Sequence, residues 1–359
     1  MKRSILLILT LILLFAALSA AAGQTPVYED LPTREPPKVG VLSYLNLSEE
    51  PYAVMMMVRE MVIDLMIKQG YIKMNYKGPE PVGRPEPEDG ERPERQAFTI
   101  MYFDRLTDML MALQAGDVDR IEVYQCVAKY LAANNPELEY GFEFDYSKEQ
   151  SVFVQKMLPQ RLGNGFSFLM KEENRELADQ FNGAIRAMKE DGTMDRLAAE
   201  YLDGVKAGDP AGIPLPQIDG AETISVAVTG DLPPMDFISA DGLPAGFNTA
   251  ILAEISHRIG RNINIVEVDS AARSLALESG LADVVFWTRT VLITKPFSGR
   301  PANDPPYMKD LSEEEQELFR EIREISSIDD YVYADIPEGT ISTEVYFTDV
   351  IVPVMMKRK

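Results

Sequence analysis

The chain has few of the residues that most often carry catalysis or bind metals. Its 359 residues include one cysteine, one histidine and one tryptophan. The single cysteine, Cys126, excludes a disulfide within the chain, and its position far from the N-terminus excludes a lipid-modified cysteine at a cleavage site. The single histidine, His257, has no evident Cys or Ser partner for nucleophilic catalysis. We therefore expect both residues to have packing roles and the protein not to be an enzyme.

Positive charge is also scarce. Lys plus Arg number 35 against 57 Asp plus Glu, which gives a formal net charge of −22. Nucleic acids and anionic membrane surfaces are bound by basic patches, so this acid excess excludes nucleic acid as a partner. The sequence also contains no glycine-rich phosphate loop and no metal-ligand spacing, and we expect no cofactor and no metal.

The N-terminus has the three-part pattern of a secretory signal peptide. Lys2 and Arg3 precede an apolar run over residues 5–18, and a small-residue segment, Ala-Ala-Ala-Gly, follows. The apolar run is close to the roughly 20 residues that span a bilayer, so an uncleaved anchor is the alternative. The small-residue exit favours a cleaved signal over residues 1–23. Both interpretations place the rest of the chain outside the cytoplasm, in the periplasm or secreted.

The first part of the chain alternates strand and helix patterns. A Pro-rich, strongly charged stretch at 77–96 is expected to be a loop insertion. Strands are predicted at 38–42, 97–103, 120–123 and 166–170, and helices at 51–69, 105–115, 125–133 and from Leu177 to Gly192, with Thr193 capping a final short helix. This alternation indicates an α/β domain over residues 37–205.

A Gly- and Pro-rich linker at 203–222 marks a domain boundary. Beyond it, a second α/β domain is predicted over residues 224–359. Its expected strands are 224–230, 262–268, 282–287 and 350–355, and its expected helices are 245–260 and 271–279. A helical insertion is expected at 296–330, where Ser312 and Glu315 have the capping-box spacing.

The two domains together resemble the type 2 periplasmic solute-binding proteins, especially the group that serves polar amino-acid transport. Segments similar to lobe one of that family are ADGLPAGFNTAILAEISHRIG and SLALESGLADVVFW, within 224–294. Segments similar to lobe two are LTDMLMALQAGDVDRIEVYQCVAKYLAANNPEL at 106–138 and NGFSFLMKEENRELADQFNGAIRAMKEDGTMDRLAAEYL at 164–202. The resemblance implies a two-lobed α/β fold that binds its ligand in a cleft between the lobes.

The order of these segments is reversed relative to the family, in which lobe one comes first. Joining the C-terminal segment STEVYFTDVIVPVMMKRK to residue 37 would restore the family order. The sequence therefore predicts a circular permutation of the two lobes. The alternative is two tandem, degenerate copies of the unit.

The resemblance also identifies candidate ligand-binding residues. After the strand at 282–287, Thr288 and Thr290 occupy hydroxyl positions and Lys295 stands where the family has Arg, while Arg289 and Arg300 are possible substitutes. The expected binding residues are Ser43, Asn46, Tyr124, Asp231, Phe237, Thr288, Arg289, Thr290 and Lys295.

Several family positions are changed. Leu232 and Met235 replace aromatic residues that pack on the ligand, and Tyr124 replaces the Asp that pairs with a ligand amino group.

The signal pattern, the family resemblance and the loss of that Asp together predict an exported protein that captures a small polar, carboxylate-bearing metabolite and delivers it to an ABC-type membrane transporter. The alternative is a sensory or protein-interaction module, with another periplasmic protein as partner, that kept the fold without binding amino acids.

Overall fold

The structure is a computed structural model that describes residues 37–43, 73–74, 99–143, 163–203, 208, 211–290, 308–309, 311–325 and 337–357. Only the backbone is described at 73–74, 142–143, 163, 271, 288–290 and 321–325. Pro37–Lys359 form one compact unit, distinct from Met1–Pro36. Outside the described residues lie the predicted signal segment, the helix at 51–69, the loop at 77–96, Asn46, Lys295 and Arg300.

The fold is α/β, as predicted, and its main sheet has ten strands in two similar parts. We call the first part the first half-sheet. Its strand order is β3 (Thr99–Phe103), β1 (Lys38–Leu42), β4 (Arg120–Tyr124), β15 (Phe347–Met356) and β5 (Leu138–Tyr140). Strand β1 is parallel to β3 and β4, whereas β15 is antiparallel to β4 and β5.

The second half-sheet repeats this arrangement. Its strand order is β12 (Asn262–Glu267), β8 (Thr223–Val228), β13 (Val284–Thr290), β7 (Gly163–Lys171) and β14 (Thr340–Ser342). Strand β8 is parallel to β12 and β13, whereas β7 is antiparallel to β13 and β14. Among the three parallel strands of each half-sheet, the first in the chain thus lies between the other two.

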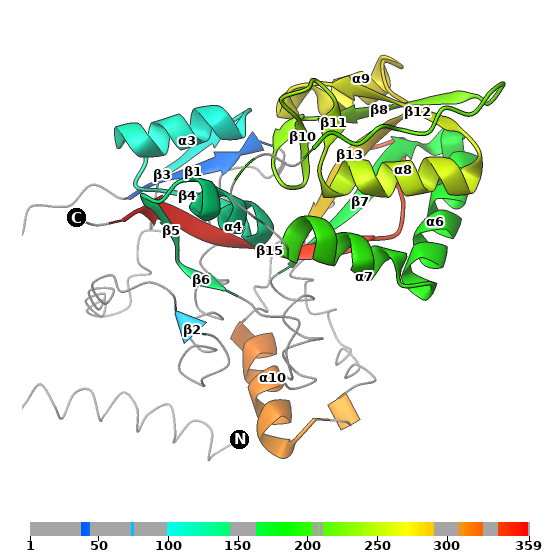
Figure 1. Cartoon of the computed structure of the whole chain (residues 1–359). Coiled ribbons are helices and arrows are strands. Elements are labelled where there is room, and N and C mark those ends of the chain that lie inside the picture. Colours follow the sequence, from blue (N-terminus) through cyan, green and yellow to red (C-terminus); the bar gives the residue numbers. More distant parts are fainter. Residues whose placement is uncertain are drawn as a thin grey trace, which may run out of the picture. The chain divides into compact units, whose positions relative to one another are not determined.

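The antiparallel strand of each half-sheet comes from the opposite part of the sequence. Strand β7 precedes the linker but pairs with β13, and β15 lies at the C-terminal end but pairs with β4. The two strands also pair with each other, from Phe347 with Phe166 to Val350 with Gly163 (Figure 1). The sequence-based division at residue 205 differs from this arrangement, because strand pairing places β7 in the second half-sheet.

The helices follow the apolar periodicity of the sequence. Their bounds are α3 Leu106–Ala115, α4 Gln125–Asn134, α6 Arg175–Glu190, α7 Thr193–Ala198 followed by a π-helical turn Ala199–Asp203, α8 Phe247–Ile259, α9 Arg273–Glu278 and α10 Glu313–Ile325, with 3₁₀ turns at Glu172–Asn174 and Ser270–Ala272. Helix α3 buries Leu106, Met109 and Leu113 at helical spacing and ends at Gly116, whose φ of 80° is left-handed. Three short strands, β9 (Asp231–Leu232), β10 (Asp236–Ile238) and β11 (Pro244–Ala245), form a separate small sheet, and β2 (Lys73–Met74) pairs with β6 (Phe142–Glu143).

The two predicted helix caps have different outcomes. The capping box at α10 is confirmed, since the Ser312 N–H donates to Glu315 Oε2 at 2.9 Å and the Glu315 N–H donates to Ser312 Oγ at 3.2 Å. The predicted Thr193 cap is wrong, because Gly192 is the N-cap of α7 and the Thr193 N–H itself donates to Asp191 Oδ1 at 2.9 Å.

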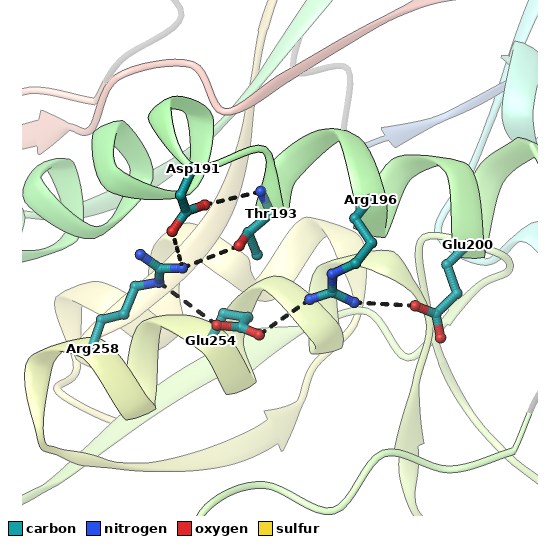
Figure 2. Close-up of polar contacts among 6 residues, drawn as sticks. All are labelled: Asp191, Thr193, Arg196, Glu200, Glu254 and Arg258. Atoms are coloured by element: carbon teal, nitrogen blue, oxygen red, sulfur yellow. Dashed lines mark hydrogen bonds and ion pairs between the residues drawn. The ribbon is translucent and has the colours of Figure 1, made fainter.

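A polar network fixes α6 and α7 against α8 (Figure 2). The guanidinium of Arg258 on α8 donates to Asp191 at 2.8 Å and to Thr193 at 3.2 Å. Glu254 of α8 lies within ion-pair distance of Arg258, at 3.6 Å, and of Arg196, at 3.4 Å. The pKa of Asp191 is lowered to about 2, mainly by hydrogen bonds that its carboxylate accepts from the hydroxyl and the N–H of Thr193 and then by the one from Arg258. Helices α6 and α7, which follow β7, therefore pack against α8, the helix that connects β8 and β12 of the second half-sheet.

Candidate ligand-binding site

Five of the predicted binding residues lie at the carboxyl ends of parallel strands. Ser43 follows β1, Tyr124 ends β4, and Thr288, Arg289 and Thr290 end β13. Ligands of open α/β sheets bind beyond the carboxyl ends of the strands, so this placement is the expected one for a binding site. In one respect the prediction was wrong: residues 288–290 do not form a loop but continue β13, paired with β7 up to Thr290 and Asn164.

Asp231 also follows a carboxyl strand end, that of β8, and its contacts cross to the first half-sheet. Its Oδ2 accepts the backbone N–H of Leu106, the first residue of α3, at 2.8 Å. The side chain is 12% exposed. Burial raises the pKa of Asp231 to about 6, although the Leu106 N–H and the Arg105 guanidinium favour its charged form. The carboxylate of Asp231 thus satisfies a free N–H at the start of a helix from the other part of the sheet.

Arg105 is a residue of this site that the sequence did not single out. It is the N-cap residue of α3, and its guanidinium lies 3.6 Å from Asp231, 3.4 Å from Glu267 and 3.9 Å from Asp269. Glu267 ends β12 and Asp269 follows it. The signal that could have identified these residues is their position, since Arg105 follows β3 and the two acids follow β12 at carboxyl strand ends.

A buried hydrogen-bond network holds the turn that carries Asp231. Asp236 accepts hydrogen bonds from the hydroxyl of Thr229 at 2.9 Å, the N–H of Gly230 at 3.1 Å and the amide of Asn248 at 2.9 Å. Tyr346 donates its hydroxyl to Asn248 Oδ1 at 2.7 Å. Burial raises the pKa of Asp236. Because the three hydrogen bonds of Asp236 tie the turn at residues 229–236 to itself and to α8, the network fixes the position of Asp231 relative to β8.

The other candidates with described side chains are buried in the protein or hydrogen-bonded to another of its side chains. Phe237 lies in β10 and is 7% exposed, and Leu232 and Met235 belong to the hydrophobic core. Ser43 donates its hydroxyl to Asp104 at 2.6 Å. Tyr124 is 1% exposed, and its ring meets that of Phe166 edge-on at 4.7 Å between centroids. Asp231 and Tyr124 thus both contact the opposite half-sheet, Asp231 through a hydrogen bond and Tyr124 through its ring.

A second buried carboxylate caps a helix in the same manner. Asp349 on β15 accepts the N–H of Cys126, near the start of α4, at 2.9 Å. Burial raises the pKa of Asp349 to about 6 and that of the Cys126 thiol well above its usual range. The predicted packing role of Cys126 is confirmed, since the residue is buried. The packing role predicted for His257 is wrong, because that side chain is exposed on the outer side of α8.

A pocket in the described residues lies elsewhere, between β7, β14 and α9. Its volume is about 340 Å³, and its lining includes Leu169, Leu277, Glu172, Glu278 and Glu338. None of the predicted binding residues lines this pocket. Among the described side chains, no group of three or more His, Cys, Asp or Glu could hold a metal ion, and none of the described helices is long and apolar enough to cross a membrane.

Residues 224–292 match the model of a protein family, the bacterial extracellular solute-binding proteins, family 3. This segment runs from β8 to just beyond β13. No curated protein sequence is significantly similar to the chain.

Several solved structures are similar to the structure of this chain. The ligand-binding component of an ABC-type import system from Staphylococcus aureus, solved with zinc bound, has 7% identity and a TM-score of 0.35, covering 90% of this chain and 66% of that chain. A phosphate-binding protein of a phosphate ABC transporter from Streptococcus pneumoniae has 11% identity and a TM-score of 0.32, covering 89% of both chains. The periplasmic aliphatic sulphonate binding protein from Escherichia coli has 11% identity and a TM-score of 0.25, covering 70% of this chain and 53% of that chain. The chain thus spans less than two thirds of the first and the third of these proteins.

Proposed function

We propose that the protein is an exported solute-binding protein that captures a small carboxylate-bearing metabolite for an ABC-type membrane transporter. The observation that carries the proposal is the repeated strand order. In each half-sheet it brings the carboxyl ends of the parallel strands, with their polar side chains, to one edge, which we call the carboxyl edge. The family match over 224–292 supports a solute-binding role for this segment. The signal-peptide pattern over residues 1–23 supports export to the periplasm or the medium.

The ligand class follows from the charges at the two carboxyl edges. Arg289 is the basic candidate at the end of β13 and Lys295 follows it in the sequence, whereas Arg105 at the start of α3 is paired with Asp231, Glu267 and Asp269. Tyr124 stands where the family carries an Asp for a ligand amino group, so no acidic residue replaces that partner at the end of β4. We therefore propose an anionic or neutral polar ligand with a carboxylate or similar acceptor, in preference to a free α-amino acid.

A second candidate function is a sensory or interaction module without an amino-acid site. The burial of Tyr124, Leu232 and Met235 favours it, because side chains at these positions are packed into the protein.

A thermal-shift screen of the mature protein separates the two functions. A ligand that binds only the folded state stabilises it by about 2.7 kcal/mol at 100 times its Kd. A melting point raised by dicarboxylates supports capture, whereas no shift with amino acids, dicarboxylates, amines or anions supports the module.

The basic side chains near the end of β13 provide a direct test of the ligand class. A charge-assisted hydrogen bond contributes roughly 1.5–3 kcal/mol. We expect Arg289→Ala or Lys295→Ala to weaken the binding of a carboxylate ligand by about tenfold or more, as measured by calorimetry. Arg320→Ala is the matched control, because Arg320 is an exposed arginine on α10 that pairs with Glu317. Equal affinity of all four proteins would reject the proposed site.

We also propose that the chain is a circular permutation of the family order. The exchange of β7 and β15 supports a single two-part unit, because tandem copies would each complete their own sheets. The registers of β15 and β1 against β4 bring Met356 and Lys38 to the same edge, with one strand between them. Two strand spacings amount to about 10 Å, which a loop of about four residues can span.

Rejoining the chain in the family order tests the permutation. In this variant, residue 357 is linked to residue 37 by a short Gly-Ser loop and the chain is opened between residues 203 and 211. We expect one cooperative unfolding transition and the far-ultraviolet circular dichroism of the original protein, because every described strand pair is retained. The control has the same loop but is opened between Ile251 and Leu252, inside α8. Loss of folding in both variants would favour tandem copies.

A further inference from the structure

The two half-sheets meet at two places in the described residues that lie on different elements. The first is the pairing of β7 with β15, which forms the continuous link of the ten-stranded sheet. The second is the start of α3, which contacts β9, the last residue of β12 and Asp269 just after it. Domain closure in proteins commonly combines a hinge with a distant contact that forms when the parts come together. The paired strands suit the hinge, and the start of α3 suits the closing contact.

The closing contact is made of named polar groups. From the first half-sheet come the Leu106 N–H and the Arg105 guanidinium, and from the second come the carboxylates of Asp231, Glu267 and Asp269. Glu267 and Asp269 are 47% and 65% exposed and Arg105 is 43% exposed, so their pairs contribute little in water. Asp231 is 12% exposed and accepts an N–H at 2.8 Å, so it dominates the contact.

We infer that Asp231, with Leu106 and Arg105, forms a latch that holds the two half-sheets together without a ligand and closes more firmly in acid. The contact uses only groups of the chain itself, so it does not rest on the proposed solute. It places a carboxylate of the protein at the start of a helix, where an N–H otherwise lacks a partner.

The direction of the pH effect follows from linkage. In the latched state burial raises the pKa of Asp231 to about 6, with the nearby Asp236 adding to the rise and Arg105 opposing it. An opened latch returns Asp231 to water, where an aspartate titrates near pH 3.9. The latched state therefore binds the proton more tightly, and protonation favours it. The ratio of latched to open molecules is expected to rise about tenfold from about pH 7 to pH 5.

Three further carboxylates lie near the latch. Glu267 and Asp269 face Arg105 from the end of β12, and Asp108 lies in the first turn of α3. Glu267 and Asp269 attract Arg105 only as charged carboxylates, so the loss of either charge would open the latch instead of closing it. The pH dependence therefore separates control by Asp231 from control by the exposed acids.

Spin-label distance measurements on the unliganded, full-length protein test the latch. Labels at Met111→Cys on α3 and Leu275→Cys on α9 use side chains that are 55% and 63% exposed, one on each side of the contact. The native Cys126 is buried, and the raised pKa of its thiol keeps it protonated and slow to react. The short-distance population should grow about tenfold relative to the long one from about pH 7 to pH 5.

Two variants and one control complete the design. Asp231→Asn keeps an oxygen for the Leu106 N–H but cannot titrate, so its distance distribution should not change over this pH range. Arg105→Ala should shift the distribution at pH 7 to longer distances, whereas Arg175→Ala, an exposed arginine paired with Glu172, should not. A distance that lengthens in acid, or an identical pH response in the wild type and Asp231→Asn, would overturn the inference.

Discussion

Replacing Phe168 by Ala is expected to destabilise the protein by about 3–5 kcal/mol. Phe168 is fully buried in β7, the strand that joins the two half-sheets. Its ring lies 5.2 Å from Phe181, 5.0 Å from Phe286 and 5.0 Å from Tyr346, measured between centroids. These partners come from α6, β13 and the segment before β15, so one cavity would loosen contacts among three distant parts of the chain.

Urea unfolding followed by circular dichroism measures this effect. The matched control is Leu275→Ala on α9, where the side chain is 63% exposed and the change should stay within about 0.5 kcal/mol. Similar losses in the two variants would show that β7 is not the core strand described here.

Removing the charge of Asp349 is expected to flatten the pH dependence of stability. Burial raises the folded-state pKa of Asp349 to about 6, above the value near 3.9 of an unfolded aspartate. Because the folded-state pKa is raised, the stabilisation by the bound proton is complete below about pH 4 and is lost as the pH rises through about 6. The loss should be on the order of 2–3 kcal/mol, since one pKa unit corresponds to about 1.4 kcal/mol.

Asp349→Asn is the informative variant, because its amide oxygen can still accept the Cys126 N–H without carrying a charge. We expect the stability of the wild type to fall relative to Asp349→Asn between about pH 4 and pH 7. Asp349→Ala removes the cap as well and should be less stable than Asp349→Asn at every pH, by about 1 kcal/mol. Parallel pH profiles for the wild type and Asp349→Asn would contradict the assignment.

Local sequence patterns predicted the elements well because they report local geometry. The strand at 38–42 coincides with β1, and the apolar spacing around Phe181 and Ile185 marks the buried side of α6. The capping box at Ser312 was also predictable, since both partners lie within one turn.

Contacts between distant segments were not predictable in this way. The exchange of β7 and β15 joins residues near 165 to residues near 348, and no local periodicity reports such pairing. The caps that Asp231 and Asp349 provide for α3 and α4 also come from remote strands. Helix-start patterns look only at neighbouring residues, so they missed the capping roles of both carboxylates and the position of Arg105, although the family resemblance had already made Asp231 a candidate binding residue.

The central claim is that a small carboxylate-bearing solute binds at the carboxyl edges of the two half-sheets. Isothermal titration of the mature protein with dicarboxylates and with ordinary α-amino acids tests it most directly. We expect saturable binding of a dicarboxylate that Arg289→Ala or Lys295→Ala weakens by about tenfold or more. Tight binding of an α-amino acid that neither substitution affects would contradict both the ligand class and the site.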